Sequence, residues 1–178
     1  QQDVYYQKIT NLAKPMRAFH NYIKSNVIFT YCKRKLFKNE FKKMDVLDIG
    51  CGKGGDIQKF FHSRVRGYVG FDPNANGIYS ASDGALSRYS NFKKKFPDFP
   101  KMDFLVADAT ALLNYEDQKK TINKTRSSNE FLLKKIFGEN DKKLSNRKFD
   151  IFNCQLMMHF VLRDDLSLNN FCQNINDH

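Results

Sequence analysis

Residues 46–55 read Val-Leu-Asp-Ile-Gly-Cys-Gly-Lys-Gly-Gly, a short apolar run that leads directly into a glycine-rich turn. The apolar run is typical of a buried strand. Glycines at positions 50, 52 and 54 permit positive φ and close backbone approach, so the chain can turn sharply from a strand into a helix beneath a ligand. This stretch therefore predicts a nucleotide-like cofactor site at the end of a strand in an α/β fold.

Two kinds of ligand fit a turn of this form. Gly50, Gly52 and Gly55 have the spacing of the dinucleotide motif G-x-G-x-x-G, which by itself is a weak signal. However, Asp48 near the end of the strand and Asp56 at the start of the helix would repel a pyrophosphate that lay over the turn. The same carboxylates suit the cationic amino acid end of S-adenosylmethionine. We therefore interpret the turn as a methyl-donor site, with a carboxylate satisfied by backbone amides as the alternative for Asp48.

Two further apolar runs also end in an acid. Residues 67–72 read Gly-Tyr-Val-Gly-Phe-Asp, and Asp72 follows the glycine turn by about 20 residues, as the ribose-binding acid of Rossmann-type folds does. Residues 103–108 repeat the arrangement, and Asp108 can accept a hydrogen bond from an adenine amino group. Because the carboxyl ends of parallel strands meet at one edge of a sheet, we expect the three acids to surround one ligand.

The composition indicates one domain with a polyanionic partner. A length of 178 residues fits a single core, and 30 Lys plus Arg against 19 Asp plus Glu give a formal charge of +11. Nucleic acid is the commonest partner of so basic a protein, although solvated helix faces also explain many runs of lysine. No apolar run is long enough to cross a bilayer, and the four cysteines have no metal-ligand spacing, so we expect no metal site.

The order of the apolar patterns predicts a Rossmann-like α/β domain that occupies residues 1–178. We expect four segments: a helical element with one or two amphipathic helices (1–44), cofactor-binding βα units with helices near 56–62 and 81–92 (45–114), a polar surface insertion (115–148), and a fourth strand, a substrate motif and a helix (149–178). Only about four parallel strands can be traced, and a doubly wound sheet has more. We therefore expect the domain to be incomplete at its carboxyl end.

Three separated segments resemble the messenger RNA cap guanine-N7 methyltransferases, particularly the methyltransferase domain of capping enzymes of large DNA viruses. Residues 47–56 match the family's Leu-Asp-hydrophobic-Gly-Cys-Gly-Lys-Gly-Gly-Asp at every position. Residues 17–25 are similar to its Arg-x-Phe-Asn-Asn-aromatic-x-Lys-Ser element, and residues 154–160 to its Cys/Ser-Gln-Phe-x-x-His-Tyr element. The resemblance covers nearly the whole chain and implies a class I S-adenosylmethionine-dependent methyltransferase.

The resemblance also implies which residues contact each ligand. The residues expected at S-adenosylmethionine, or at its product S-adenosyl-L-homocysteine, are Lys24, Asp48, Gly50, Gly52, Asp72, Asp108 and Gln155. Those expected at the cap are Asn21, Lys53 and Arg88 on the phosphates, with His20, His159 and Phe160 nearer the guanine or the donor. His20 stands where the family has Asn, and Phe160 where it commonly has Tyr, so we expect a hydrogen bond to be lost and stacking to be kept.

The implied reaction is transfer of a methyl group from S-adenosylmethionine to N7 of the guanine cap of messenger RNA, with no catalytic acid or base. The expected partners are capped RNA and other domains or subunits of a capping enzyme, without a membrane. The expected location is intracellular, in a cytoplasmic viral factory or virion for a viral protein and in the nucleus otherwise. Two alternatives stay open: a noncatalytic or truncated module that binds RNA or cofactor, and a Rossmann methyltransferase for another RNA or a small molecule.

Overall fold

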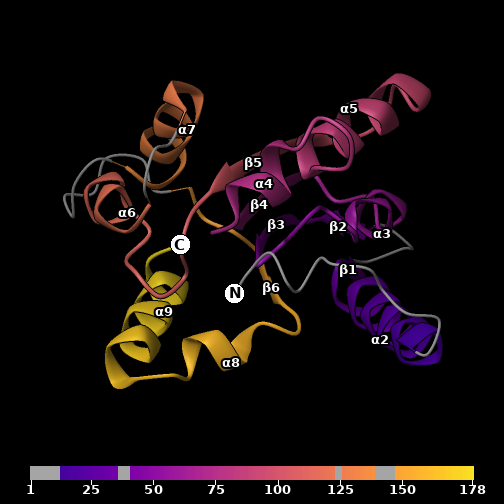
Figure 1. Cartoon of the computed structure of the whole chain (residues 1–178). Helices are drawn as coiled ribbons and strands as arrows, with labels where there is room; N and C mark the ends of the chain where they lie inside the picture. Colours follow the sequence, from indigo (N-terminus) through magenta and orange to yellow (C-terminus); the bar gives the residue numbers. More distant parts are fainter. Residues whose placement is uncertain (1–12, 36–40, 123–125, 139–146) are drawn as a thin grey trace.

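The computed structural model describes residues 13–35, 41–122, 126–138 and 147–178. Within these ranges the fold is built on a four-stranded parallel sheet, as the sequence predicts (Figure 1). The strands, in their order across the sheet, are β5 (Lys101–Val106), β4 (Gly67–Asp72), β3 (Asp45–Ile49) and β6 (Ile151–Cys154).

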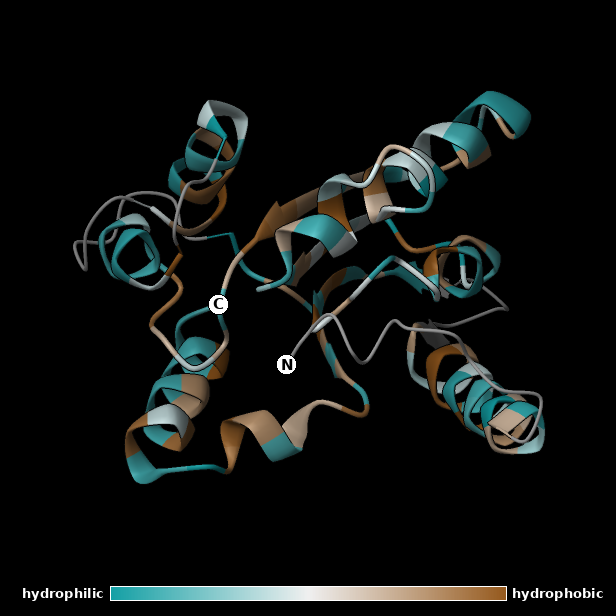
Figure 2. Cartoon of the chain, in the orientation of Figure 1, coloured by the Kyte–Doolittle hydropathy of each residue, from teal (hydrophilic) through white to brown (hydrophobic). Residues whose placement is uncertain are grey.

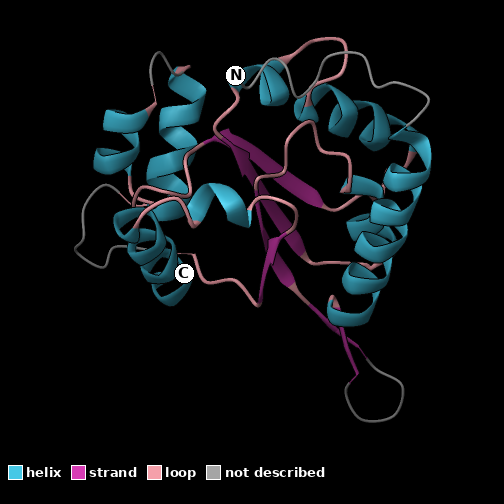
Figure 3. Ribbon diagram, turned by 60° about the horizontal axis from the view of Figure 1, so that its bottom comes forward, coloured by secondary structure: helices cyan, strands magenta, loops and turns pink. Residues whose placement is uncertain are grey.

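Helices pack on both faces of this sheet (Figure 3). The first face is covered by α2 (Lys14–Tyr31), α3 (Ile57–His62), α4 (Ala75–Tyr79) and α5 (Ala85–Lys95). The second is covered by α6 (Tyr115–Thr121), α7 (Ser127–Phe137), α8 (Met158–Val161) and α9 (Asp165–Asp177). The brown apolar segments of the sheet lie between these two layers (Figure 2). Burial of both faces explains why the strands read as nearly continuous apolar runs.

Strand β3 shows how one strand supplies both cores. Successive side chains of a strand point to opposite faces, so Val46 lies in the cluster beneath α2 to α5, whereas Leu47 lies in the cluster beneath α7 to α9. Strand β4 does the same with Tyr68 and Val69. Asp48 is the exception, because it is a buried carboxylate near the carboxyl end of this apolar strand.

The amino-terminal helix ends earlier than the sequence predicts. The helix α2 stops at Tyr31, where the amide of Cys32 donates to the Ile28 carbonyl oxygen at 2.9 Å. Strands β1 (Lys33–Lys35) and β2 (Phe41–Lys43) then pair as an antiparallel ribbon that extends away from the main sheet (Figure 3). The prediction of helix through residues 33–35 is wrong, because the three- and four-residue apolar spacing of α2 stops at Tyr31.

The segment 115–148, which the sequence predicts to be a polar surface insertion, contributes directly to the core. Its helix α7 buries Leu133, Ile136 and Phe137 in the cluster on the second face, and ends at Gly138, whose φ is +86°. The polar composition hides this role because only one stripe of α7 is apolar. The described part of this segment is therefore a structural layer of the domain.

Two smaller points concern the remaining helices. The helix expected over residues 81–92 starts at Ala85, after a separate short helix α4 and a turn over residues 80–84. Asp164 caps α9, with its carboxylate accepting from the Ser167 amide at 2.7 Å. None of the helices within the described ranges is both long and apolar enough to span a membrane.

Candidate functional site

The glycine turn curls over the carboxyl edge of the sheet directly after β3. Gly50, Gly52 and Gly54 adopt φ values of +74°, +54° and +69°, which is the conformation that the sequence predicts for them. The amides of Gly50 and Cys51 both donate to the carbonyl oxygen of Phe71 in β4, at 2.9 and 3.0 Å. The turn is thus tied to the neighbouring strand rather than left as a free loop.

Gly54 and its neighbour Gly55 provide a matched test of this turn. A Cβ on Gly54 would lie 2.5 Å from Cδ1 of the buried Ile57, whereas a Cβ on Gly55 would meet nothing within 4 Å. We expect Gly54→Ala to lower the free energy of unfolding by about 2–3 kcal/mol, from the left-handed conformation and the overpacking together. Gly55→Ala should leave it nearly unchanged. Urea unfolding measures both, and equal stability of the two variants would contradict the turn geometry.

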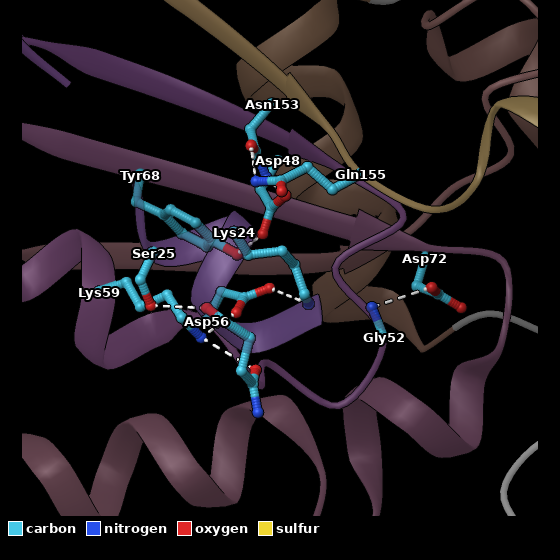
Figure 4. A network of polar contacts seen from close by, with 11 residues as sticks. Lys24, Ser25, Asp48, Gly52, Asp56, Lys59, Tyr68, Asp72, Asn153 and Gln155 are labelled. Carbon is cyan, nitrogen blue, oxygen red and sulfur yellow. Dashed lines mark hydrogen bonds and ion pairs between the residues drawn. The ribbon is translucent and has the colours of Figure 1, made fainter. Parts of the chain in front are cut away.

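Asp72, the last residue of β4, holds the turn from the side. Its Oδ2 accepts from the Gly52 amide at 3.0 Å, and its Oδ1 accepts from the Asn74 amide at 2.9 Å (Figure 4). These two bonds use about half of the lone-pair positions of a carboxylate, so both oxygens retain acceptor capacity for a diol. Burial raises the pKa of Asp72, and the nearby charge of Asp108 raises it further. The position and chemistry fit the ribose-binding role that the sequence predicts.

Asp48 lies beneath the turn in a buried polar network (Figure 4). Its Oδ2 accepts from the Tyr68 hydroxyl at 2.6 Å, and its Oδ1 accepts from Nδ2 of Asn153 at 2.6 Å. Asn153 in turn accepts from Nε2 of Gln155 at 2.7 Å, so the network extends from β3 to the loop after β6. The partners of this carboxylate are side chains of adjacent strands, not the backbone amides of the alternative interpretation.

The protonation of Asp48 reflects these surroundings. Burial raises the pKa of Asp48 from its ordinary 3.8 to about 6, although the hydrogen bonds from Tyr68 and Asn153 oppose the rise. The residue is only 4% exposed. It is therefore ionised near neutral pH at a cost in stability, and it places a negative charge directly under the glycine turn.

Tyr68 and Gly70 are site residues that the motif analysis missed. Gly70 pairs with Asp48 across the sheet, and a Cβ on Gly70 would lie 2.6 Å from the Tyr68 hydroxyl oxygen. The Tyr68 ring therefore crosses the bare backbone of Gly70 to reach Asp48. The one available signal was a glycine within a strand, which often marks a close approach of this kind.

Asp108 lies two residues beyond the end of β5, and buried amides shape its surroundings. Its Oδ1 accepts from the Thr110 amide at 2.9 Å. The side-chain amide of Gln118 in α6 forms two hydrogen bonds with the backbone of Asp108. It accepts from the Asp108 amide at 2.8 Å and donates to the Asp108 carbonyl oxygen at 2.9 Å. Asn129 of α7 bonds to the backbone of Val106 in the same way, accepting from its amide at 2.7 Å and donating to its carbonyl oxygen at 3.0 Å. The two helices of the segment 115–148 thus position this edge, which the sequence analysis did not foresee.

The helix α2 docks on the far side of the turn through Asp56. Lys24 Nζ lies 2.6 Å from Oδ2 of Asp56, and Lys59 Nζ lies 2.5 Å from its Oδ1 (Figure 4). Lys59 also reaches Oδ1 of Asn21 at 3.4 Å. Burial opposes ionisation of Asp56, but the two ammonium groups hold its pKa below the ordinary value. Lys24 and Asn21 are therefore brought to the glycine turn, and His20 is half-buried on the same helix.

The two other predicted phosphate contacts come together at one acid. Lys53, within the glycine turn, donates to the carboxylate of Asp83. Arg88, on α5, donates from Nε to the carbonyl oxygen of the same residue at 3.1 Å. Residues 35 positions apart in the sequence thus share one surface, as a common ligand would require.

The segment after β6 presents an aromatic pair beside the turn. The rings of His159 and Phe160 on α8 have centroids 4.1 Å apart, and both side chains are exposed. Leu156 before them has φ +63°, an uncommon conformation for leucine that often occurs at functional sites. Met157 packs onto the turn, since its Cγ lies 2.9 Å from where a Cβ of Gly50 would be. The segment that carries the predicted guanine-binding residues therefore packs against the glycine turn through Met157.

The charge of this edge distinguishes between the two kinds of ligand that the sequence suggests, a dinucleotide with a pyrophosphate and S-adenosylmethionine. Asp48 is the residue before the last in β3, Asp72 ends β4, and Asp108 follows β5, and these three strands are adjacent in the sheet. Two lysines near the start of α3, Lys24 and Lys59, are paired with Asp56. An edge lined by carboxylates opposes a pyrophosphate and favours a ligand that carries a positive charge and a diol. No cluster of His, Cys, Asp or Glu that could hold a metal ion occurs among the residues described.

Comparison with known proteins identifies relatives over most of the chain. A family model of the mRNA (guanine-N(7))-methyltransferase domain matches residues 7–177. The chain is 44% identical over 173 residues to the "Probable mRNA-capping enzyme" of Acanthamoeba polyphaga mimivirus. This alignment covers 97% of this chain and 14% of the mimivirus protein. It is 30% identical over 159 residues to the "mRNA cap guanine-N(7) methyltransferase" of Caenorhabditis briggsae, covering 89% of this chain and 34% of that protein. The chain thus spans a minor part of the length of both relatives.

Proposed function

Because this chain belongs to the mRNA (guanine-N(7))-methyltransferase domain family, we propose that it transfers a methyl group from S-adenosylmethionine to N7 of the guanine cap of messenger RNA. One observation carries the proposal: Asp48, Asp72 and Asp108 gather at the carboxyl edge of three adjacent strands, around a turn with three left-handed glycines. Capped RNA is the proposed substrate, and further domains of a longer capping enzyme are the proposed partners.

The residues of this edge fit the proposed methyl donor. Asp72 has acceptor capacity on both oxygens for the two ribose hydroxyls, and its bonds to Gly52 and Asn74 hold it in place. Asp108 is held at the next strand end for the adenine amino group. The buried charge of Asp48 lies where it attracts the cationic amino acid end, with Gln155 as the outer end of the same network.

The proposed mechanism depends on orientation and needs no proton transfer. S-adenosylmethionine, when bound, supplies a methyl group on a positively charged sulfur. Guanine N7 already carries a lone pair, so the chain has no proton to remove before the reaction. The role of the side chains is to hold the reacting atoms in line and to keep the charge of the site favourable while positive charge passes to the purine. His159 and Phe160 offer the stacking surface, and Lys53 and Arg88 the cations for the phosphates.

A two-part experiment tests this function. Calorimetric titration with S-adenosylhomocysteine should show binding, while NADH should show none. Transfer of labelled methyl groups should then be seen to RNA with an unmethylated guanosine cap, but not to uncapped RNA of the same sequence. Binding of NADH in place of S-adenosylhomocysteine would refute the donor site. Donor binding without transfer to any substrate would instead favour a noncatalytic module.

A further inference from the structure

Lys53 and Arg88 are connected through a third residue, Asp83. The carboxylate of Asp83 accepts from the Lys53 ammonium, and its backbone carbonyl accepts from Arg88 Nε at 3.1 Å. Asp83 belongs to the turn over residues 80–84, which joins α4 to α5 at the edge of the domain (Figure 1). The two cations proposed for the cap phosphates therefore both contact Asp83, Lys53 at the carboxylate and Arg88 at the backbone carbonyl.

The turn holds the Asp83 carboxylate in this position. Its Oδ1 accepts from the Ser80 hydroxyl at 2.7 Å and from the Ser82 hydroxyl at 3.4 Å. Gly84 follows in a very close turn, because a Cβ there would lie 2.6 Å from the Ser80 carbonyl oxygen. The hydrogen bond from Lys53, together with that from Ser80, holds the pKa of Asp83 below its ordinary value. Asp83 is thus a positioned anion throughout the neutral range.

The donors that Asp83 receives are those that a phosphate group would use. One ammonium and two hydroxyls surround the carboxylate oxygens. The carboxylate side chain is nevertheless 44% exposed, so a ligand can approach it from solvent. A phosphate that approached Lys53 would be repelled by this carboxylate and would have to share or take over its ammonium partner.

From this geometry we propose that Asp83 is an internal competitor of the cap phosphates, which occupies Lys53 in the free protein and lowers the affinity of the site for the phosphate chain. The inference rests on the proposed function, since it assigns Lys53 and Arg88 to the phosphates. The direction of the expected change in affinity is unusual for a residue in a binding site. Removing the carboxylate should strengthen ligand binding, whereas a residue that only positions Lys53 would weaken binding when it is removed.

The test compares Asp83→Asn with Asp117→Asn. Both substitutions remove one negative charge, and Asp117 is also an acid paired with a lysine, Lys120, but it lies on α6. The probe is inorganic tripolyphosphate, titrated against the whole chain, with S-adenosylhomocysteine as a second ligand. We expect Asp83→Asn to bind tripolyphosphate about two- to fivefold more tightly, the range for removal of one exposed charge pair. Its affinity for S-adenosylhomocysteine should stay at the wild-type value.

Three outcomes would overturn the inference: unchanged binding in Asp83→Asn, weaker binding in Asp83→Asn, or an equal gain in Asp117→Asn. The last would indicate a general effect of net charge. Failure of the proposed function has a different signature, because the wild-type protein would then bind neither S-adenosylhomocysteine nor tripolyphosphate. A wild type that binds both ligands, combined with an unimproved Asp83→Asn, would reject only the role of Asp83.

Discussion

Replacement of Asp72 by alanine is expected to abolish binding of S-adenosylmethionine, with a loss of affinity of at least about 100-fold. The carboxylate lies at the end of β4, and its bonds to the Gly52 and Asn74 amides aim it at the carboxyl edge. Two hydrogen bonds from a ribose diol to a carboxylate contribute about 1.5 kcal/mol or more each, and about 1.4 kcal/mol corresponds to tenfold in affinity. Calorimetric titration with S-adenosylhomocysteine measures the loss.

His159→Ala is the matching variant on the substrate side. His159 is exposed on α8, so its removal should leave the fold and the donor site unchanged. We expect donor affinity within about threefold of the wild type, and methyl transfer to capped RNA slowed about tenfold by the loss of stacking. Thermal unfolding of both variants separates loss of binding from loss of fold. Equal loss of donor affinity in Asp72→Ala and His159→Ala would contradict the division of roles.

Asp48→Asn is expected to stabilise the folded protein at pH 8 while it weakens donor binding. Burial raises the pKa of Asp48 from 3.8 to about 6, a rise of about two units, and each unit corresponds to about 1.4 kcal/mol. The ionised carboxylate therefore costs the fold up to about 3 kcal/mol at pH 8. Asparagine has the same shape, and the neighbouring Asn153 and Gln155 amides can reverse to maintain the hydrogen bonds.

The pH dependence identifies the residue responsible. The pKa of Asp48 in the folded protein is raised above its value in the unfolded chain. The stability that protonated Asp48 contributes to the fold is therefore fully present below about pH 3.8, and it is lost as the pH rises through about 6. The stability of Asp48→Asn relative to the wild type should therefore increase by about 2–3 kcal/mol between pH 4 and pH 8. Urea unfolding across this range measures it. A difference that did not change with pH would show that Asp48 titrates as an ordinary carboxyl.

Tyr68→Phe is a control for this interpretation. It removes the hydroxyl that donates to Oδ2 of Asp48 at 2.6 Å and keeps the ring that packs on Phe60 and Phe104. Since that hydrogen bond lowers the pKa of Asp48, its loss should raise the pKa further and shift the loss of stability to higher pH. A shift toward lower pH would contradict the network. The expected conflict between stability and function at Asp48 is a common property of binding sites.

Much of the site was predictable from the sequence, because its main features are local. The backbone conformations of Gly50 and Gly52 follow from residue type and spacing within a few positions. The placement of Asp72 and Asp108 follows from the rule that parallel strands end at one edge. The contribution of α6 and α7 was not predictable in this way. Gln118 and Asn129 are polar residues that suggest a solvent-exposed helix face until the buried backbone groups they bond to are known.

The sequence by itself therefore determined the parallel sheet, the glycine turn and the set of acids at its edge, since each depends on patterns that span a few residues. Only the tertiary structure decided what those acids contact. Asp48 meets Tyr68 because Gly70 leaves room in the adjacent strand, and Lys53 meets Asp83 because α4 and α5 bring a distant turn beside the first one. Such contacts depend on strand register and helix packing over 20 to 30 residues, which spacing along the chain does not encode.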